Sequence, residues 1–139
     1  MRLIDGRIGG PLVHPFRIAV EARDIAAVVD LLAEDVVFRS PVAFNPYEGR
    51  SVVATLLEAA LHVFQDFRYV RELGKPAGRD VALVFDARIA GRQVEGCDVV
   101  HTDDSGRITE LAVMVRPLSG VLALNEGTTA RLAAPELRG

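Results

Sequence analysis

The stretch that decides the fold runs from Val81 to Pro117 and reads VALVFDARIAGRQVEGCDVVHTDDSGRITELAVMVRP. At its start every second residue is apolar, which is the period of a β-strand with one buried face; these residues are Val81, Leu83, Phe85, Ala87 and Ile89. Gly91 and Arg92 then predict a tight connection, and the segment DDSG at 103–106 is the strongest hairpin signal in the chain. The stretch therefore predicts an antiparallel meander.

The same pattern places further strands of the meander over 94–102 and 108–117, and an earlier one over 67–71. The segments before the meander predict helices instead. Apolar residues at helical spacing indicate one helix over 11–20 and a second one that begins after Asp24, whose side chain can cap it.

A short strand over 36–40, a loop over 41–49 and a third helix over 51–64, capped by Ser51, complete the first half. Helices followed by antiparallel strands define an α+β domain, with the three N-terminal helices packed on one face of a curved, mainly antiparallel sheet. Three helices cannot fill the hollow of such a sheet, so we expect a cone-shaped apolar cavity, a kind of place where ligands bind.

The chain divides into three parts. We expect a flexible N-terminal arm over 1–10, one domain over 11–118 and a C-terminal tail over 119–139. The tail has a weak helical pattern that Gly127 interrupts. We expect it to be partly helical and to act as a lid over the cavity or to pack against a neighbouring subunit.

Composition excludes several classes of protein. The 139 residues fit one compact domain, half of them are hydrophobic, and the formal net charge is −3, which argues against nucleic acid as a partner. Cys97 is the only cysteine, so an internal disulfide and a cysteine-based zinc site are excluded. The first residues have no signal-peptide pattern and no run is long enough to span a membrane, so we expect a cytoplasmic protein without membrane contact.

The order of these elements resembles the NTF2-like superfamily, also called cystatin-like, and in particular its SnoaL-like members. Three segments carry the resemblance, which spans roughly residues 12–118: DIAAVVDLLAEDVVF at 24–38, PVAFNPYEG at 41–49 and DSGRITEL at 104–111. The superfamily includes ketosteroid isomerase, limonene epoxide hydrolase, polyketide cyclases, scytalone dehydratase and many binding modules. The resemblance therefore implies the fold and leaves the activity open.

Asp98 is the candidate catalytic residue. It shares strand parity with Val94, Gly96 and Val100, so its carboxyl faces the apolar side, where desolvation raises a carboxyl pKa. The stretch CDVVHTDDSGRI also resembles the strand and hairpin of ketosteroid isomerase, which places Asp98 at the aspartate that stays protonated there and donates a hydrogen bond to the enolate.

Other catalytic roles of these families have no match here. Ser40 stands where the resemblance to ketosteroid isomerase implies a base aspartate, and Phe16 stands where it implies an oxyanion tyrosine, so we do not expect that activity. The Asp–Arg–Asp set of limonene epoxide hydrolase is also not found. SnoaL-type polyketide cyclases rely largely on one acidic residue and on pocket shape, a requirement that Asp98 alone meets.

We expect the cavity to bind a small, largely apolar organic molecule without a cofactor or a metal. Its predicted lining is Phe16, Val20, Phe38, Ser40, Phe44, Tyr47, Leu57, Leu83, Phe85, Val100, Leu111, Val113 and Val115. Tyr47 and Tyr69 can each offer a hydroxyl to a ligand, and Tyr47 is the better placed at a rim. The chemistry that fits is cyclisation, isomerisation or dehydration by proton transfer.

Two alternatives remain open: a non-catalytic carrier or sensor that uses the same pocket, and a structural module whose core is filled. The histidines His14, His62 and His101 are dispersed and have no metal-ligand spacing, so their expected roles are structural. The outer face of the sheet carries Val99, Ala112 and Met114 among polar neighbours, which predicts a homodimer through that face.

Overall fold

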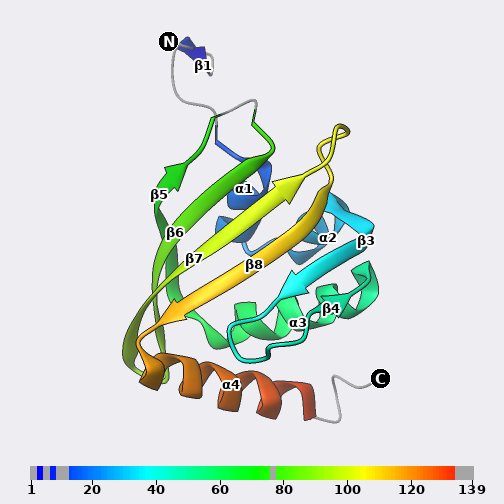
Figure 1. Cartoon of the computed structure of the whole chain (residues 1–139). Coiled ribbons are helices and arrows are strands. Elements are labelled where there is room, and N and C mark those ends of the chain that lie inside the picture. The colour runs from blue at the N-terminus through cyan, green and yellow to red at the C-terminus, as the bar shows by residue number, and fades with distance from the viewer. Residues whose placement is uncertain (1–2, 5–6, 9–12, 76–77, 134–139) are drawn as a thin grey trace.

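The computed structural model describes residues 3–4, 7–8, 13–75 and 78–133. Its helices are α1 (Pro15–Glu21), α2 (Ile25–Leu31), α3 (Arg50–Val63) and α4 (Leu118–Ala133). Its strands are β1 (Leu3–Ile4), β2 (Arg7–Ile8), β3 (Leu32–Arg39), β4 (Tyr47–Glu48), β5 (Gln65–Leu73), β6 (Asp80–Ile89), β7 (Arg92–Thr102) and β8 (Ile108–Arg116) (Figure 1). None of the helices in the described ranges is long and apolar enough to cross a membrane.

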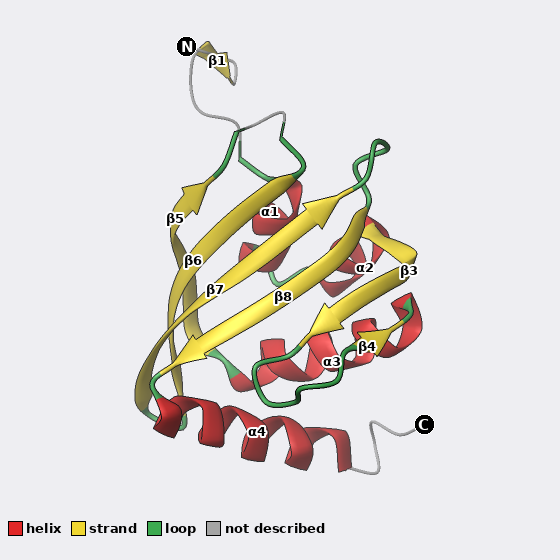
Figure 2. Cartoon of the chain, viewed as in Figure 1, coloured by secondary structure: helices red, strands yellow, loops and turns green. Residues whose placement is uncertain are grey.

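A curved six-stranded sheet forms one layer, in the order β4–β3–β8–β7–β6–β5. All neighbouring strands are antiparallel except β3 and β8, which run parallel. Helices α1, α2 and α3 cover one face of the sheet, and α4 lies across the end at which β8 finishes (Figure 2). The predicted α+β architecture, with three N-terminal helices on a mainly antiparallel sheet, is confirmed. Within the segment predicted as an arm, β1 and β2 pair antiparallel, with Leu3 opposite Ile8.

The meander follows the predicted alternation closely. In β6 the residues predicted to face inward are all buried, namely Val81, Leu83, Phe85, Ala87 and Ile89. The turn between β7 and β8 is organised by Asp103, whose carboxylate oxygen Oδ1 accepts hydrogen bonds from the backbone N–H groups of Ser105 and Arg107 at 2.9 and 3.0 Å. Gly106 in this turn has φ of +86°, a conformation that glycine adopts without a steric penalty.

The helix starts are partly as predicted. Asp24 caps α2, and its Oδ1 accepts from the backbone N–H of Ala27 at 3.1 Å. Pro11, the predicted start of the first helix, lies outside the described residues; α1 begins at Pro15 and is capped by His14. The prediction that Ser51 caps α3 is wrong, since Gly49 at φ of +102° is the N-cap and the helix is already formed at Arg50.

The tail differs most from the prediction. Residues Leu118–Ala133 form one continuous helix, which passes through Gly127 without interruption. A Cβ at Gly127 would lie 2.9 Å from a methyl carbon of Val63, so the glycine is where α4 packs closely on α3. Gly127 therefore marks a close contact between two helices, which a single sequence cannot distinguish from a helix break.

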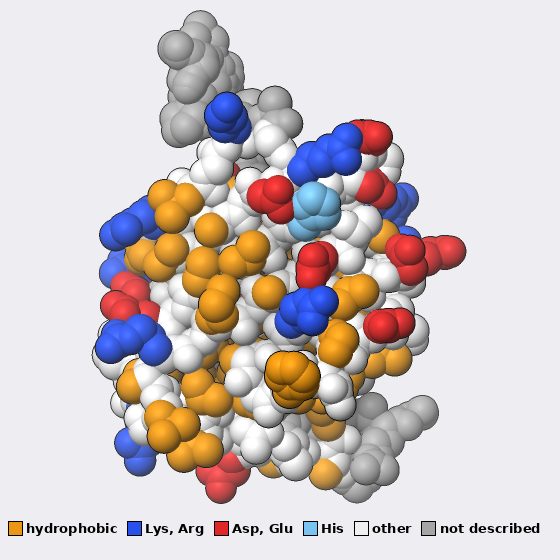
Figure 3. All heavy atoms as spheres, viewed as in Figure 1, with side chains coloured by type: hydrophobic (Ala, Val, Ile, Leu, Met, Phe, Trp, Pro, Cys, Tyr) orange, Lys and Arg blue, Asp and Glu red, His pale blue; other side chains and the backbone are white. Residues whose placement is uncertain are grey.

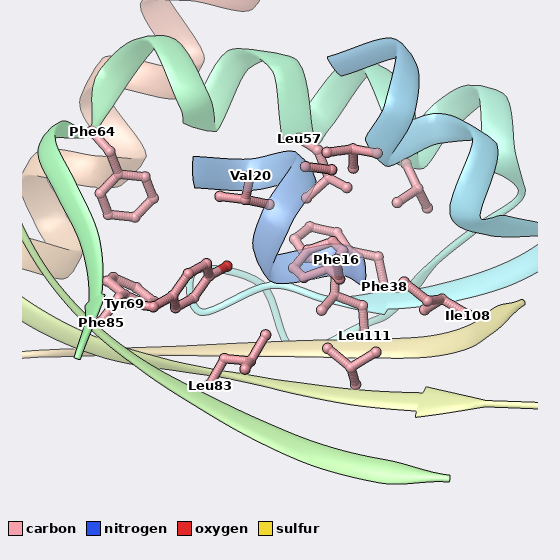
Figure 4. Packing of buried hydrophobic residues seen from close by; sticks show 14 of the residues in the cluster. Phe16, Val20, Phe38, Leu57, Phe64, Tyr69, Leu83, Phe85, Ile108 and Leu111 are labelled. Carbon is pink, nitrogen blue, oxygen red and sulfur yellow. The ribbon is translucent and has the colours of Figure 1, made fainter. Parts of the chain in front are cut away.

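The core lies between the three N-terminal helices and the sheet. Figure 4 shows the aromatic rings of Phe64, Tyr69 and Phe85 at one end of this layer. Phe16, Phe38 and Leu111 lie at the other end, towards Ile108. The helices and the sheet thus enclose an apolar interior that has an aromatic group at each end.

Candidate functional site

A cavity of about 170 Å³ lies inside this apolar layer. Of the thirteen residues predicted to line it, nine do so: Phe16, Val20, Phe38, Ser40, Tyr47, Leu57, Phe85, Leu111 and Val113. The candidate catalytic residue Asp98 also lines it. Further lining comes from α3 and from α4, including Leu56, Ala60, Leu61, Leu124, Asn125, Thr128, Thr129 and Leu132. The helices and the sheet therefore leave a hollow, and most of its wall is apolar.

Four residues predicted for the lining lie elsewhere. Phe44 is 97% exposed on the loop between β3 and β4, so its predicted position in the hollow is wrong. Leu83 and Val100 have the predicted inward parity but are fully covered by core neighbours, and Val115 packs against the core outside the cavity. The parity of a strand residue gives the face that it occupies, and the depth of packing above that face decides whether it meets an open space.

Asp98 is buried at this cavity, with 6% of its surface exposed, and it has a specific partner. The Tyr69 hydroxyl donates a hydrogen bond to Asp98 Oδ2 at 2.5 Å. Burial raises the pKa of the Asp98 carboxyl to about 7, although the Tyr69 hydrogen bond acts in the opposite direction. Burial, together with the nearby Asp98 charge, raises the pKa of Tyr69 as well, so its hydroxyl remains a donor.

The sheet register brings this pair together. Tyr69 on β5 lies opposite Phe85 on β6, and Asp98 on β7 lies opposite Leu83, two residues along β6. All four side chains are buried on the inner face, and Tyr69 reaches across β6 to the carboxyl. Figure 4 shows the side chains of Tyr69, Phe85 and Leu83 on this face. Its ring is held by an edge-to-face contact with Phe67, whose centroid is 5.0 Å away. The hydroxyl is thus fixed in position before any ligand arrives.

The second oxygen of Asp98 remains available. Oδ1 has no hydrogen-bond partner among the described residues, and the residue lines the cavity. A protonated carboxyl can therefore accept from Tyr69 on one oxygen and donate from the other to a group in the cavity. Within the described lining, Asp98 is the only carboxyl, and no histidine is present.

Ser40 and Thr128 are polar lining residues whose hydroxyls are already engaged. Ser40 Oγ accepts from the backbone N–H groups of Val42 and Ala43 at 3.0 and 3.2 Å, which shapes the loop after β3. Thr128 Oγ1 donates to the carbonyl of Leu124 one turn earlier, at 2.8 Å. Three polar lining side chains have no hydrogen-bond partner within the described ranges, and they are Tyr47, Asn125 and Thr129.

The remaining candidate residues lie away from the cavity. His14 caps α1, where its Nδ1 accepts from the backbone N–H of Phe16 at 3.0 Å. His101 Nδ1 lies 2.6 Å from Asp80 Oδ1 on the outer side of the sheet, and Cys97 also faces outward, as its parity predicts. No group of three metal-ligating side chains occurs within the described part of the chain.

Sequence reasoning identifies only part of the site. It names Tyr69 as a hydroxyl for a ligand, but the contact of Tyr69 with Asp98 depends on the order β5–β6–β7 and on the register of both pairs. The inward alternation of Phe67 and Tyr69 was the available signal. The polar residues of α4 were also missed, because the predicted break at Gly127 removed the helical face that carries them.

Comparison with known proteins identifies the family. Residues 13–111 match the model of the SnoaL-like domain, and the chain belongs to this family. The fold is the NTF2-like, or cystatin-like, fold. No curated protein matches the chain in sequence.

Two solved structures are similar over most of their length. A steroid delta-isomerase from Pseudomonas aeruginosa is 45% identical, with a TM-score of 0.81, over 85% of this chain and 86% of that one. A protein with a cystatin-like fold from Silicibacter pomeroyi is 32% identical, with a TM-score of 0.82, over 88% of this chain and 85% of that one. The chain is therefore related to ketosteroid isomerases in family and in architecture.

Proposed function

We propose that the cavity binds a small, largely apolar organic molecule whose carbonyl oxygen accepts a hydrogen bond from protonated Asp98. The observation that carries this proposal is the buried Asp98–Tyr69 pair at the wall of an otherwise apolar cavity. A buried acid without a function is costly to a small domain. With a pKa of about 7, the carboxyl is about half protonated near pH 7 and mostly protonated below it.

The chemistry that fits is proton transfer without a cofactor. A hydrogen bond from Asp98 stabilises negative charge that develops on a carbonyl oxygen when a neighbouring carbon transfers its proton to a water molecule. Since the described lining offers one carboxyl and no histidine, the site suits substrates whose carbon acid needs little more than this activation. Cyclisation, isomerisation and dehydration belong to this class, and the similar protein from Pseudomonas aeruginosa is a steroid delta-isomerase.

A direct test uses 1-tetralone, a two-ring ketone. Its binding is measured by calorimetry, and the exchange of the hydrogens next to its carbonyl is followed by NMR in deuterated buffer. We expect the protein to bind the ketone and to accelerate exchange, and Asp98→Asn to lose most of the acceleration. Asp35→Asn, which changes an exposed carboxylate outside the lining, is the matched control. Equal binding and exchange by the parent and Asp98→Asn would contradict the proposal.

A non-catalytic carrier is the second candidate. It is favoured by Ser40 and Phe16, which both line the cavity but lack the carboxylate and the hydroxyl that the resemblance to ketosteroid isomerase implies at these positions. A carrier binds the ketone through Asp98 and does not change its exchange rate. The same experiment therefore separates the two candidates, because binding and exchange are read independently.

We also propose that the outer sheet face, which is turned away from the helices, pairs with a second copy of the chain. Two apolar rows cross β6, β7 and β8 on this face: Val84, Cys97 and Met114, and Ala82, Val99 and Ala112. Figure 3 shows hydrophobic side chains gathered here with charged groups around them. Both signs of charge border the rows, in the ion pairs Arg39–Glu110 and Arg116–Glu95, so two copies can meet without net repulsion.

Light scattering tests this pairing. We expect a particle of twice 15.0 kDa for the parent, and a monomer for Val99→Glu, which places a charge in the middle of the apolar rows. Leu122→Glu is the control, because Leu122 is an exposed apolar residue of α4 that lies outside the sheet. A monomeric parent would rule out the pairing.

A further inference from the structure

The cavity has a closed end and an open end, and each carries its own polar groups. Asp98 and Tyr69 are 6% and 5% exposed, so they mark the closed end. Asn125 and Thr129 line the same cavity but are exposed to solvent, so they mark its opening. Most of the wall between these ends is apolar.

The polar groups at the opening come from the solvent-side edge of the α4 face that lines the cavity. On this face α4 also presents apolar residues, namely the buried Leu124 and the half-buried Leu132. Asn125 and Thr129 are four residues apart and therefore on the same side of the helix, at the edge that is exposed to solvent. Neither polar side chain has a hydrogen-bond partner within the described residues.

We propose that Asn125 and Thr129 bind a second polar group of the ligand, at the end opposite to the carbonyl that Asp98 binds. This inference rests on the proposed function and names the class of ligand: a one-ring or two-ring carbonyl compound with a hydroxyl group at its far end. The size follows from the cavity of about 170 Å³, which is close to the ~150 Å³ engineered cavity that accommodates benzene. Larger ring systems would extend past α4 into solvent.

The two ends of such a ligand meet different chemistry. The carbonyl accepts from the Asp98 carboxyl at the buried end of the cavity, whereas the hydroxyl exchanges hydrogen bonds with an amide and a hydroxyl beside solvent. Contacts at the opening contribute less to affinity than buried ones, since water competes for the same groups. Asn125 and Thr129 therefore orient the ligand and select its outer group, and Asp98 provides the reactive contact.

The test compares 6-hydroxy-1-tetralone with 6-methyl-1-tetralone, which have the same rings and nearly the same size. We expect the parent to bind the hydroxyl compound about fivefold more tightly by calorimetry, the size of effect that one net hydrogen bond produces. Asn125→Leu and Thr129→Val roughly keep side-chain volume. Each is expected to bring the ratio of the two affinities closer to one and to leave the affinity for the methyl compound within about twofold of that of the parent. Glu126→Ala, on the same helix but outside the lining, keeps the preference.

The outcomes separate this inference from the function on which it rests. If both compounds bind in a manner that Asp98→Asn weakens, but the parent shows no preference for the hydroxyl, the inference about α4 is wrong and the proposed function stands. The inference is also wrong if Tyr47→Phe removes the preference and the α4 variants do not, because Tyr47 is the other polar lining side chain without a hydrogen-bond partner within the described ranges. If neither compound binds to the parent, both proposals fail.

Discussion

The ring of Phe85 occupies the space beside Gly96 that a side chain would fill. A Cβ at Gly96 would lie 2.1 Å from Cζ of Phe85 and 2.7 Å from the carbonyl oxygen of Met114, so β7 accepts only glycine at this point. The ring that fills this space also stacks on Phe67 at 4.5 Å and lines the cavity. Because Gly96 has no side chain, the Phe85 ring can lie against β7 at this point and form part of the cavity wall.

Gly96→Ala is therefore expected to lower the free energy of unfolding by about 1–3 kcal/mol, the usual cost of overpacking a core. Chemical denaturation measures the change. The cost is expected to be smaller in the background Phe85→Leu, whose shorter side chain leaves room for the methyl group, so the two substitutions are not additive. Equal costs in both backgrounds would show that the Phe85 ring is not what the new methyl group meets.

Asp98 makes stability depend on pH. An aspartate in an unfolded chain has a pKa of about 3.9, whereas burial raises that of Asp98 to about 7. The folded chain therefore holds the proton more tightly than the unfolded chain does. The stabilisation of the folded state by this proton is complete below about pH 4 and is lost as the pH rises through about 7. Over this interval the loss is on the order of 4 kcal/mol.

Asp98→Asn is expected to remove this dependence, because an amide has no proton to lose and its oxygen can still accept from Tyr69. Relative to the parent, the variant gains stability between about pH 5 and about pH 8, as urea denaturation at both values would show. The exposed Asp35→Asn serves as the control and is expected to follow the parent. A parent whose stability does not fall over this range would contradict the raised pKa of Asp98.

The predictable parts of the fold are those that alternation determines. The inward face of β6 and the inward direction of Asp98 follow from the two-residue period alone, since neither depends on which strands are neighbours. The cap at Asp24 is equally local, because its carboxylate reaches an N–H only three residues away.

The parts that sequence could not provide depend on contacts between distant segments. Tyr69 meets Asp98 only because β6 separates β5 from β7 in a particular register. Gly127 lies within α4, at the point where Val63 of α3 leaves no room for a side chain. Phe44 faces outward from a loop in which Ser40 Oγ accepts hydrogen bonds from the backbone N–H groups of Val42 and Ala43. The alternation of apolar residues gives no sign of this loop conformation.

The turn between β6 and β7 offers a stabilising substitution. Ile89 pairs with Arg92, and the two residues between them, Ala90 and Gly91, have φ of +50° and +79°. Such two-residue turns favour Asn-Gly, because asparagine tolerates positive φ better than alanine does. Ala90→Asn is expected to raise the free energy of unfolding by about 0.5–1 kcal/mol, measured by thermal and urea denaturation.

Ala90→Val is the opposing control for this turn. A β-branched side chain at positive φ is strained, so this variant is expected to be less stable than the parent. If asparagine and valine changed stability in the same direction, the backbone conformation of Ala90 would not be the cause.

His14 gives a second pH dependence, with the opposite sign to that of Asp98. Its Nδ1 accepts from the backbone N–H of Phe16 and caps α1, which only the unprotonated nitrogen can do. Burial lowers the pKa of His14, although the charge of Glu72 acts against this. The cap is therefore complete above the unfolded-state pKa of about 6.5 and is lost as the pH falls through the lower value of the folded state.

His14→Asn keeps a capping oxygen at every pH, and His14→Ala is expected to cost about 1 kcal/mol above neutrality. In the background Asp98→Asn, stability should then fall as the pH drops below about 6.5, and the further change His14→Asn should flatten that fall. A fall that persists with asparagine at both positions would assign it to groups other than the α1 cap.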